Sequence, residues 1–138
     1  MIGPERFIEP LAPAIAAERA GTKLDWESIN RSLKLMSQGS DVMIVEGVGG
    51  LMVPMDAKHT VLDMVRWLSV PVIVVARPAL GTINHTLLTL QVLRAAGFKP
   101  AGVVINRYPA ERASVAEETN PRAIEKWGKI PILAIVPD

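Results

Sequence analysis

Three short polar segments each follow an apolar run and could carry chemistry. The first is Glu-Gly-Val-Gly-Gly at residues 46–50, directly after the apolar run 42–45. A carboxylate where a buried strand surfaces needs a cation, a hydrogen-bond donor or water, and a magnesium ion beside a phosphate is one such cation. The glycines permit positive φ or a close approach of the backbone to a ligand. The segment therefore indicates either a metal and phosphate site at Glu46 or a tight turn with a solvated carboxylate.

The second polar segment, residues 77–85, follows the apolar run 70–76. Its proline and glycine end the strand, and Thr82 or Asn84 can cap a helix that follows. Free N–H groups at such a helix start favour an anion such as a carboxylate. The alternative is that both side chains only cap the helix.

The third segment is Asn106 and Arg107, after the apolar run 101–105. A side-chain amide has a donor and an acceptor side by side, which suits the edge of an adenine ring. Asparagine at the end of a strand is also an ordinary turn former, so both interpretations stay open.

The elements that would position these segments alternate along the chain. Val- and Ile-rich runs predict strands, and apolar residues at helical spacing predict helices between them. The strands are expected at residues 42–45, 70–76, 101–105 and 130–136, and the helices at 26–37, 60–68, 85–96 and from Asn120 and Pro121 to 128. This order predicts an α/β fold, a doubly wound, mainly parallel sheet with helices on both faces. Ligands bind at the carboxyl ends of such strands, so all three segments are expected at one edge of the sheet.

Length and composition limit which kinds of protein this chain could be. The 138 residues fit one domain spanning 1–138, and 15 basic against 14 acidic residues, interspersed, give no basic stripe for nucleic acid. The absence of cysteine excludes disulfides and thiolate metal sites and is compatible with a cytoplasmic protein. No apolar run is long enough to span a membrane.

Together, residues 44–54, 80–89 and 102–106 resemble the dethiobiotin synthetases in order and spacing, and the likeness runs from about Phe7 to Asp138. The segment Gly-Thr-Ile-Asn-His-Thr at 81–86 is the most specific part. The resemblance implies a P-loop NTPase-like, cytoplasmic, homodimeric ligase of biotin synthesis that requires Mg²⁺. Such enzymes close a cyclic urea on 7,8-diaminononanoate with CO2 and ATP: a carbamate forms, the γ-phosphate activates it, and the second amine attacks.

The resemblance also assigns roles to individual residues. It implies that Glu46 binds magnesium and that residues 81–84 hold the substrate carboxylate across a dimer interface. The implied nucleotide-binding residues are Glu46, Gly47, Val48, Gly49, Asn106, Arg107, Ile130, Pro131 and Ile132, and the implied substrate-binding residues are Gly49, Gly81, Thr82, Ile83 and Asn84. No catalytic residue is assigned within this chain.

One departure from the family is large. The Gly-rich loop ending in Gly-Lys-Thr, which neutralises the triphosphate, does not occur in these 138 residues. We therefore expect a fold truncated at the N-terminus, with strand edges left unpaired, and no ring closure by the chain alone. The alternative is a non-catalytic dimerising or ligand-binding remnant of the family.

Overall fold

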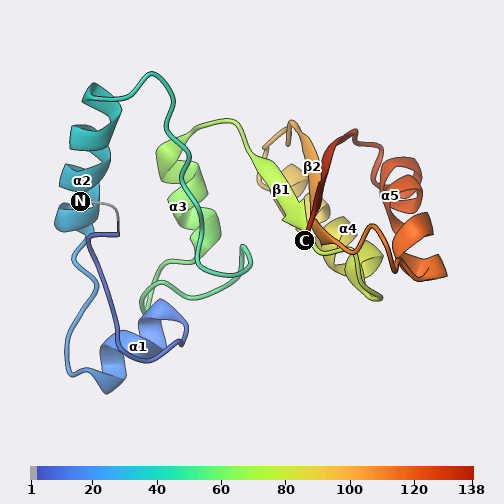
Figure 1. Cartoon of the computed structure of the whole chain (residues 1–138). Coiled ribbons are helices and arrows are strands. Elements are labelled where there is room, and N and C mark those ends of the chain that lie inside the picture. Colours follow the sequence, from blue (N-terminus) through green and yellow to red (C-terminus); the bar gives the residue numbers. More distant parts are fainter. Residues whose placement is uncertain (1–2) are drawn as a thin grey trace. The chain divides into compact units, whose positions relative to one another are not determined.

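A computed structural model describes residues 3–138, which form two compact units, residues 3–68 and Ser69–Asp138 (Figure 1). The expectation of one domain over 1–138 depends on how these units pack together, so it stays a prediction. None of the described helices is long and apolar enough to cross a membrane.

The second unit is a three-stranded parallel sheet with two helices. The strands lie in the order β1 (Ile73–Ala76), β2 (Gly102–Tyr108) and β3 (Ile132–Pro137). Helix α4 (Thr82–Ala95) connects β1 to β2, and helix α5 (Val115–Gly128) connects β2 to β3. The predicted α/β class with a parallel sheet is confirmed, because each pair of adjacent strands is parallel.

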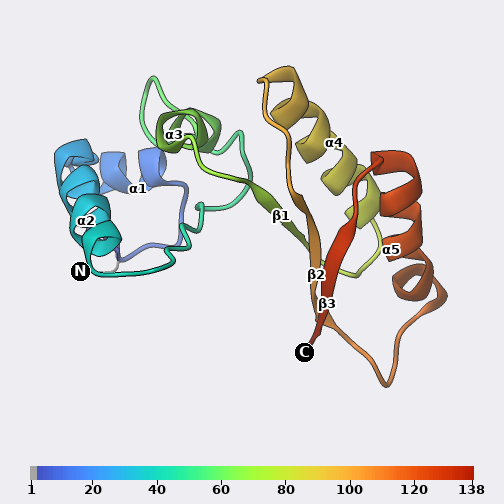
Figure 2. The same cartoon turned by 90° about the horizontal axis from the view of Figure 1, so that it is seen from above.

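The core of this unit lies between one face of the sheet and the two helices. Figure 2 shows α4 and α5 on the same side of the strands. In β1, Val74 and Ala76 are buried, whereas Ile73 is 52% and Val75 64% exposed, so only one face of that strand is covered within the unit. The buried hydrophobic residues of α4, β2 and α5 are Leu90, Leu93, Val103, Ile105 and Ile124. Helices on both faces of the sheet stay a prediction, because the placement of the first unit would decide it.

Both helices begin earlier than predicted. Helix α4 starts at Thr82 instead of 85, because Gly81 adopts a left-handed conformation with φ of 92° and takes the N-cap position. Neither Thr82 nor Asn84 therefore caps this helix, and no side chain does. Thr82 is 1% exposed and packs in the core.

The predicted start of α5 at Asn120 and Pro121 is wrong. Ser114 is the N-cap: it accepts a hydrogen bond from the backbone N–H of Glu117, whose side chain accepts one from the N–H of Ser114. This capping box satisfies two N–H groups that the helix itself cannot satisfy. Pro121 then lies inside the helix, and Asn120 is 4% exposed instead of capping it.

The first unit contains α1 (Pro13–Arg19), α2 (Trp26–Gln38) and α3 (Val61–Leu68). The two helices predicted in this region, at 26–37 and 60–68, are confirmed. Asp25 caps α2 by accepting from the N–H of Ser28 at 2.9 Å. Before α3, the side chain of Asp63 accepts hydrogen bonds from both the N–H and the hydroxyl of Thr60, each at 2.8 Å.

The strand predicted at 42–45 is absent from the described residues, so that prediction is wrong. Val42 is 79% and Ile44 88% exposed, and neither pairs with another strand. A strand exists only where a neighbour accepts and donates its backbone hydrogen bonds, and this segment has no such neighbour in its unit. Apolar composition alone therefore did not decide the conformation of this segment.

Candidate functional site

Two of the predicted segments emerge at the same edge of the second unit's sheet. Ala76 at the end of β1 pairs with Ile105 in β2. The loop of residues 77–81 directly follows β1, whereas Asn106 and Arg107 lie within β2, near its carboxyl end and just beyond the residue that pairs with Ala76. This is the edge at which parallel sheets bind ligands.

The start of α4 leaves two backbone donors unused. The N–H of Thr82 donates to Ala79 O at 3.2 Å, and that of His85 donates to Gly81 O at 3.2 Å. Among residues 3–138, no acceptor is present for the N–H groups of Ile83 and Asn84. Two adjacent free N–H groups at a helix start, together with the positive end of the helix dipole, can bind a carboxylate.

Asn106 lies next to an irregularity in β2. The pairing between β2 and β3 shifts between Ile105 and Tyr108, and Arg107 has a φ of 59°. The Asn106 side-chain oxygen accepts the N–H of Arg107 at 3.0 Å, and both residues are exposed. The amide nitrogen of Asn106 is therefore the group that this conformation leaves available to a base.

Ile130, Pro131 and Ile132 lie at the opposite end of the strands from Asn106. Val103 pairs with Ile132, and its N–H donates to Pro131 O at 3.0 Å. Asn106 is further along β2 by about 10 Å at the usual rise of a strand. The register therefore argues against the expectation that these three residues flank the same base as Asn106. Pro137, which pairs with Tyr108, lies at the Asn106 edge instead.

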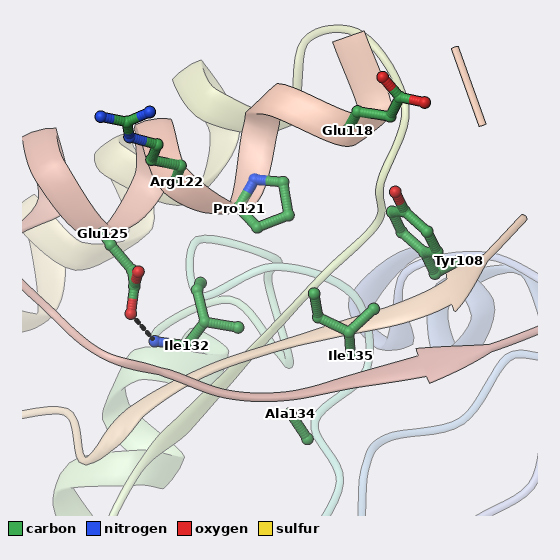
Figure 3. A pocket seen from close by; sticks show the side chains of 8 residues that line it. All are labelled: Tyr108, Glu118, Pro121, Arg122, Glu125, Ile132, Ala134 and Ile135. Carbon is green, nitrogen blue, oxygen red and sulfur yellow. Dashed lines mark hydrogen bonds between the residues drawn. The ribbon is translucent and has the colours of Figure 1, made fainter. Parts of the chain in front are cut away.

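A groove of about 470 Å³ lies between α5 and β3, and sequence reasoning did not anticipate it (Figure 3). Ile132 and Ile135 form part of its floor and Tyr108 lies at one end (Figure 3). Glu125 lines the groove and accepts the backbone N–H of Ile132 at 3.0 Å. The other lining residues are Glu118, Pro121, Arg122 and Ala134.

Glu46 belongs to the first unit, where its side chain is exposed and has no hydrogen-bond or ion-pair partner among the described residues. No group of three or more His, Cys, Asp or Glu residues that could hold a metal occurs in residues 3–138. Magnesium in nucleotide sites commonly takes one or two carboxylates and completes its shell with water and phosphate oxygens. Glu46 therefore fits the role of a single protein ligand, and its approach to the sheet edge of the second unit stays a prediction.

Packing within the chain leaves little room for a side chain at two of the glycines after Glu46, Gly47 and Gly49. Gly49 has a φ of 74°, and a Cβ there would lie 3.0 Å from a methyl group of Val53. A Cβ on Gly47 would lie 3.1 Å from a methyl group of Val61. Of the two interpretations of this segment, the structure supports a tight turn, and a role of the same backbone in ligand binding stays a prediction.

Comparison with known proteins identifies the family. The model of the AAA domain family matches residues 2–138. The chain belongs to the AAA domain family.

Within that family, this AAA domain is similar to proteins named ATP-dependent dethiobiotin synthetase BioD. It is 37% identical over 144 residues to the protein of Thermodesulfovibrio yellowstonii, covering 99% of this chain and 60% of the relative. It is 39% identical to the protein of Bacillus licheniformis, covering 99% and 57%, and 37% identical to that of Bacillus subtilis strain 168, covering 99% and 58%. This AAA domain thus spans about 60% of the length of these curated relatives.

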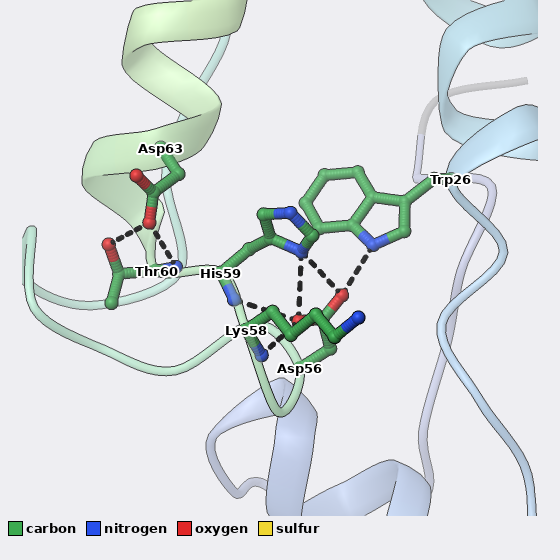
Figure 4. Close-up of polar contacts among 6 residues, drawn as sticks. All are labelled: Trp26, Asp56, Lys58, His59, Thr60 and Asp63. Atoms are coloured by element: carbon green, nitrogen blue, oxygen red, sulfur yellow. Dashed lines mark hydrogen bonds and ion pairs between the residues drawn. The ribbon is translucent and has the colours of Figure 1, made fainter.

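Sequence reasoning also missed a polar cluster around Asp56 in this AAA domain (Figure 4). The Asp56 carboxylate accepts the indole N–H of Trp26 at 2.7 Å and the backbone N–H groups of Lys58 at 2.7 Å and His59 at 2.8 Å. His59 Nδ1 lies 2.9 Å from it. Burial acts to raise the pKa of Asp56, but the hydrogen bonds from His59, Lys58 and Trp26 together outweigh it and hold that pKa well below its ordinary value.

We expect Asp56 to make the first unit sensitive to acid. A carboxyl group whose pKa is depressed by folding contributes stability that is present above its unfolded pKa, here near 3.8, and is lost as the pH falls toward the folded pKa. Asp56→Asn should therefore cost about 1 to 2 kcal/mol at pH 7 and flatten the loss of stability below pH 4. Thermal unfolding followed by tryptophan fluorescence at pH 7 and below pH 4 measures both effects.

Asp41→Asn is the matched control, because Asp41 is an exposed acid in the same unit. That variant should keep the stability and the pH dependence of the unaltered protein. An Asp56→Asn protein with the same pH dependence as the control would contradict the role of this carboxylate.

Proposed function

We propose that this AAA domain forms the substrate-carboxylate and base-binding part of an ATP-dependent dethiobiotin synthetase. Such an enzyme makes a cyclic urea from 7,8-diaminononanoate and CO2 with ATP as co-substrate. The observation that carries the proposal is the pair of unused N–H groups of Ile83 and Asn84 at the sheet edge where Asn106 emerges. The similarity to relatives named dethiobiotin synthetase supports the same conclusion.

Each proposed role follows from the chemistry of the group. Gly81 gives α4 its start, and the N–H groups of Ile83 and Asn84 bind the substrate carboxylate. Thr82, the first residue of α4, is buried, so its side chain packs this helix start against the core. Holding the far end of the substrate in this way orients its two amines, which lowers the entropic part of the barrier to ring closure.

On the nucleotide side, we propose that Asn106 donates to the base, with Arg107 beside it. Gly47, Val48 and Gly49 are proposed to lie beside nucleotide and substrate. Glu46 would hold Mg²⁺ together with phosphate oxygens and water, and the ion would offset negative charge on the triphosphate. These roles need a phosphate-binding loop, a pattern that does not occur in the 138 residues.

We further propose a cytoplasmic homodimer that binds small molecules and no nucleic acid. The balanced charge, 15 basic against 14 acidic residues, supports the exclusion of nucleic acid. Analytical ultracentrifugation tests the dimer directly, and a monomer at all concentrations would contradict it.

Calorimetric titration with 7,8-diaminononanoate tests the proposed function. We expect binding of the diamino acid and at least tenfold weaker binding of the same diamine without its carboxylate, because a hydrogen bond to a charged group contributes about 1.5 to 3 kcal/mol. Equal affinity for the two ligands, or no binding of either, would overturn the carboxylate site. Binding of the diamino acid without any ATP binding would favour a ligand-binding remnant of the family.

Substitutions at Asn84 test which group binds the carboxylate. Asn84→Pro removes a backbone N–H that has no acceptor within residues 3–138, so no hydrogen bond of α4 is lost, and it should weaken diaminononanoate binding by about 10- to 100-fold. Asn84→Ala keeps the N–H and should change the affinity by less than about threefold. If both variants, folded by circular dichroism, lost binding equally, the side chain and not the backbone would be the ligand.

A further inference from the structure

Asn120 is a buried polar side chain that the proposed function does not use. It is 4% exposed in the interior of α5, directly before Pro121. Its amide nitrogen donates to Pro78 O at 2.7 Å and lies 3.5 Å from Ala79 O. A buried amide costs free energy unless it is hydrogen-bonded, and an apolar side chain would fill the same space without that requirement. The polar group therefore needs an explanation beyond packing.

The partners of Asn120 belong to the loop that leads into α4. Pro78 is itself buried, and among residues 3–138 no other group donates to its carbonyl. The next carbonyl, that of Ala79, also accepts the N–H of Thr82, the first residue of α4. One chain of hydrogen bonds thus connects the middle of α5 to the start of α4.

Apart from the contacts with Asn120, the hydrogen bonds of this loop join residues three or four positions apart: the N–H of Thr82 donates to Ala79 O and that of His85 donates to Gly81 O. Gly81 has a φ of 92°, a conformation that glycine adopts readily, and it has no side chain that would restrict the backbone. Ala79, Leu80 and Gly81 are exposed, with Leu80 at 83%. Because three consecutive residues of this loop are exposed, packing restrains it little, and the hydrogen bonds that Asn120 donates to its carbonyl groups restrict its motion.

We propose that Asn120 is a positioning residue for the anion site at the start of α4. By fixing the carbonyls of Pro78 and Ala79, it sets the direction in which the N–H groups of Ile83 and Asn84 point. Its assignment to the binding of the diaminononanoate carboxylate rests on the proposed function. The geometric part, control of the helix start by a side chain of α5, does not.

Asn120→Asp tests the proposal with a side chain of the same shape. The ionised carboxylate cannot donate and repels both carbonyls, so the loop should shift. We expect the backbone amide resonances of Ile83 and Asn84 to move in NMR spectra, and the N–H of Thr82 to exchange with solvent at least tenfold faster. Lowering the pH until the introduced carboxyl group is protonated restores a donor and should return these resonances toward their original positions.

The affinity for diaminononanoate distinguishes a positioning role of Asn120 from an effect on stability alone. Asn120→Asp should weaken diaminononanoate by about tenfold or more at a pH where the introduced group is ionised. Asn120→Ala removes the donor without adding charge and should shift the same resonances, which keeps the test valid if the aspartate variant does not fold. Thr119→Ala, at an exposed position of the same helix, should leave the affinity and the Ile83 and Asn84 resonances unchanged.

The outcomes distinguish the two proposals. If the unaltered protein does not bind diaminononanoate, the proposed function fails, whereas the resonances of Ile83 and Asn84 still report on positioning. If folded Asn120→Asp and Asn120→Ala proteins keep these resonances and the exchange rate of the Thr82 N–H, positioning by Asn120 is wrong. Shifted resonances with unchanged diaminononanoate affinity would overturn the link between this contact and the carboxylate site.

Discussion

Leu93→Ala should lower the free energy of unfolding of the second unit by about 3 kcal/mol, within the range for leucine to alanine changes in protein cores. Leu93 lies in α4 and is 0% exposed. Ile105 of β2 and Ile124 of α5 are also 0% exposed, and a close-packed core of this kind does not relax fully into the space that a deleted side chain leaves. Urea unfolding followed by far-ultraviolet circular dichroism measures the change.

Leu88→Ala is the matched control, since it removes the same atoms from the same helix at a position that is 56% exposed. We expect that change to cost less than about 1 kcal/mol. Equal losses at Leu88 and Leu93 would mean that the core does not lie between α4 and the sheet.

Glu46→Gln tests the proposed magnesium ligand and should reduce turnover by about 100-fold or more in an active enzyme that contains this chain together with a phosphate-binding loop, because loss of such a ligand would remove several kcal/mol of charge stabilisation. The amide keeps the shape of the side chain but loses the charge that a hard cation prefers. The magnesium concentration needed for half-maximal activity should rise as well. Steady-state assays over a range of magnesium concentrations measure both quantities.

Asp41→Asn provides the comparison for Glu46, because it removes one exposed negative charge shortly before the same segment. It should leave turnover and magnesium dependence unchanged. A Glu46→Gln enzyme with an unaltered magnesium dependence would contradict the proposal that Glu46 binds the ion.

The helices show which structural features short stretches of sequence determine. The start of α2 follows from Asp25 and the apolar spacing after it, and both act within a few residues of the helix end. The start of α5 was predicted wrongly at Asn120 and Pro121, although Ser114 and Glu117 form a capping box that is visible in the sequence. The Asn-Pro pattern is equally compatible with a helix start, and the structure excludes that interpretation because α5 already begins at Val115 and Asn120 is buried against the loop of Pro78.

The strands show what local sequence leaves open. Residues 42–45 are as apolar as those of β1, yet only β1 has a neighbour that satisfies its backbone. The same limit applies to the candidate site, because the spacing of Asn106 and Pro131 along the chain does not reveal that they lie at opposite ends of the strands.

By itself, the sequence determined the α/β class, the positions of most helices and the family, because caps, helical periodicity and motifs act over a few residues. The tertiary structure alone decided which apolar run became a strand, the register of β2 and β3, and the contact of Asn120 with the loop before α4. These features depend on hydrogen bonds between groups far apart in the chain, and a donor's partner is defined only once the fold has brought the two together.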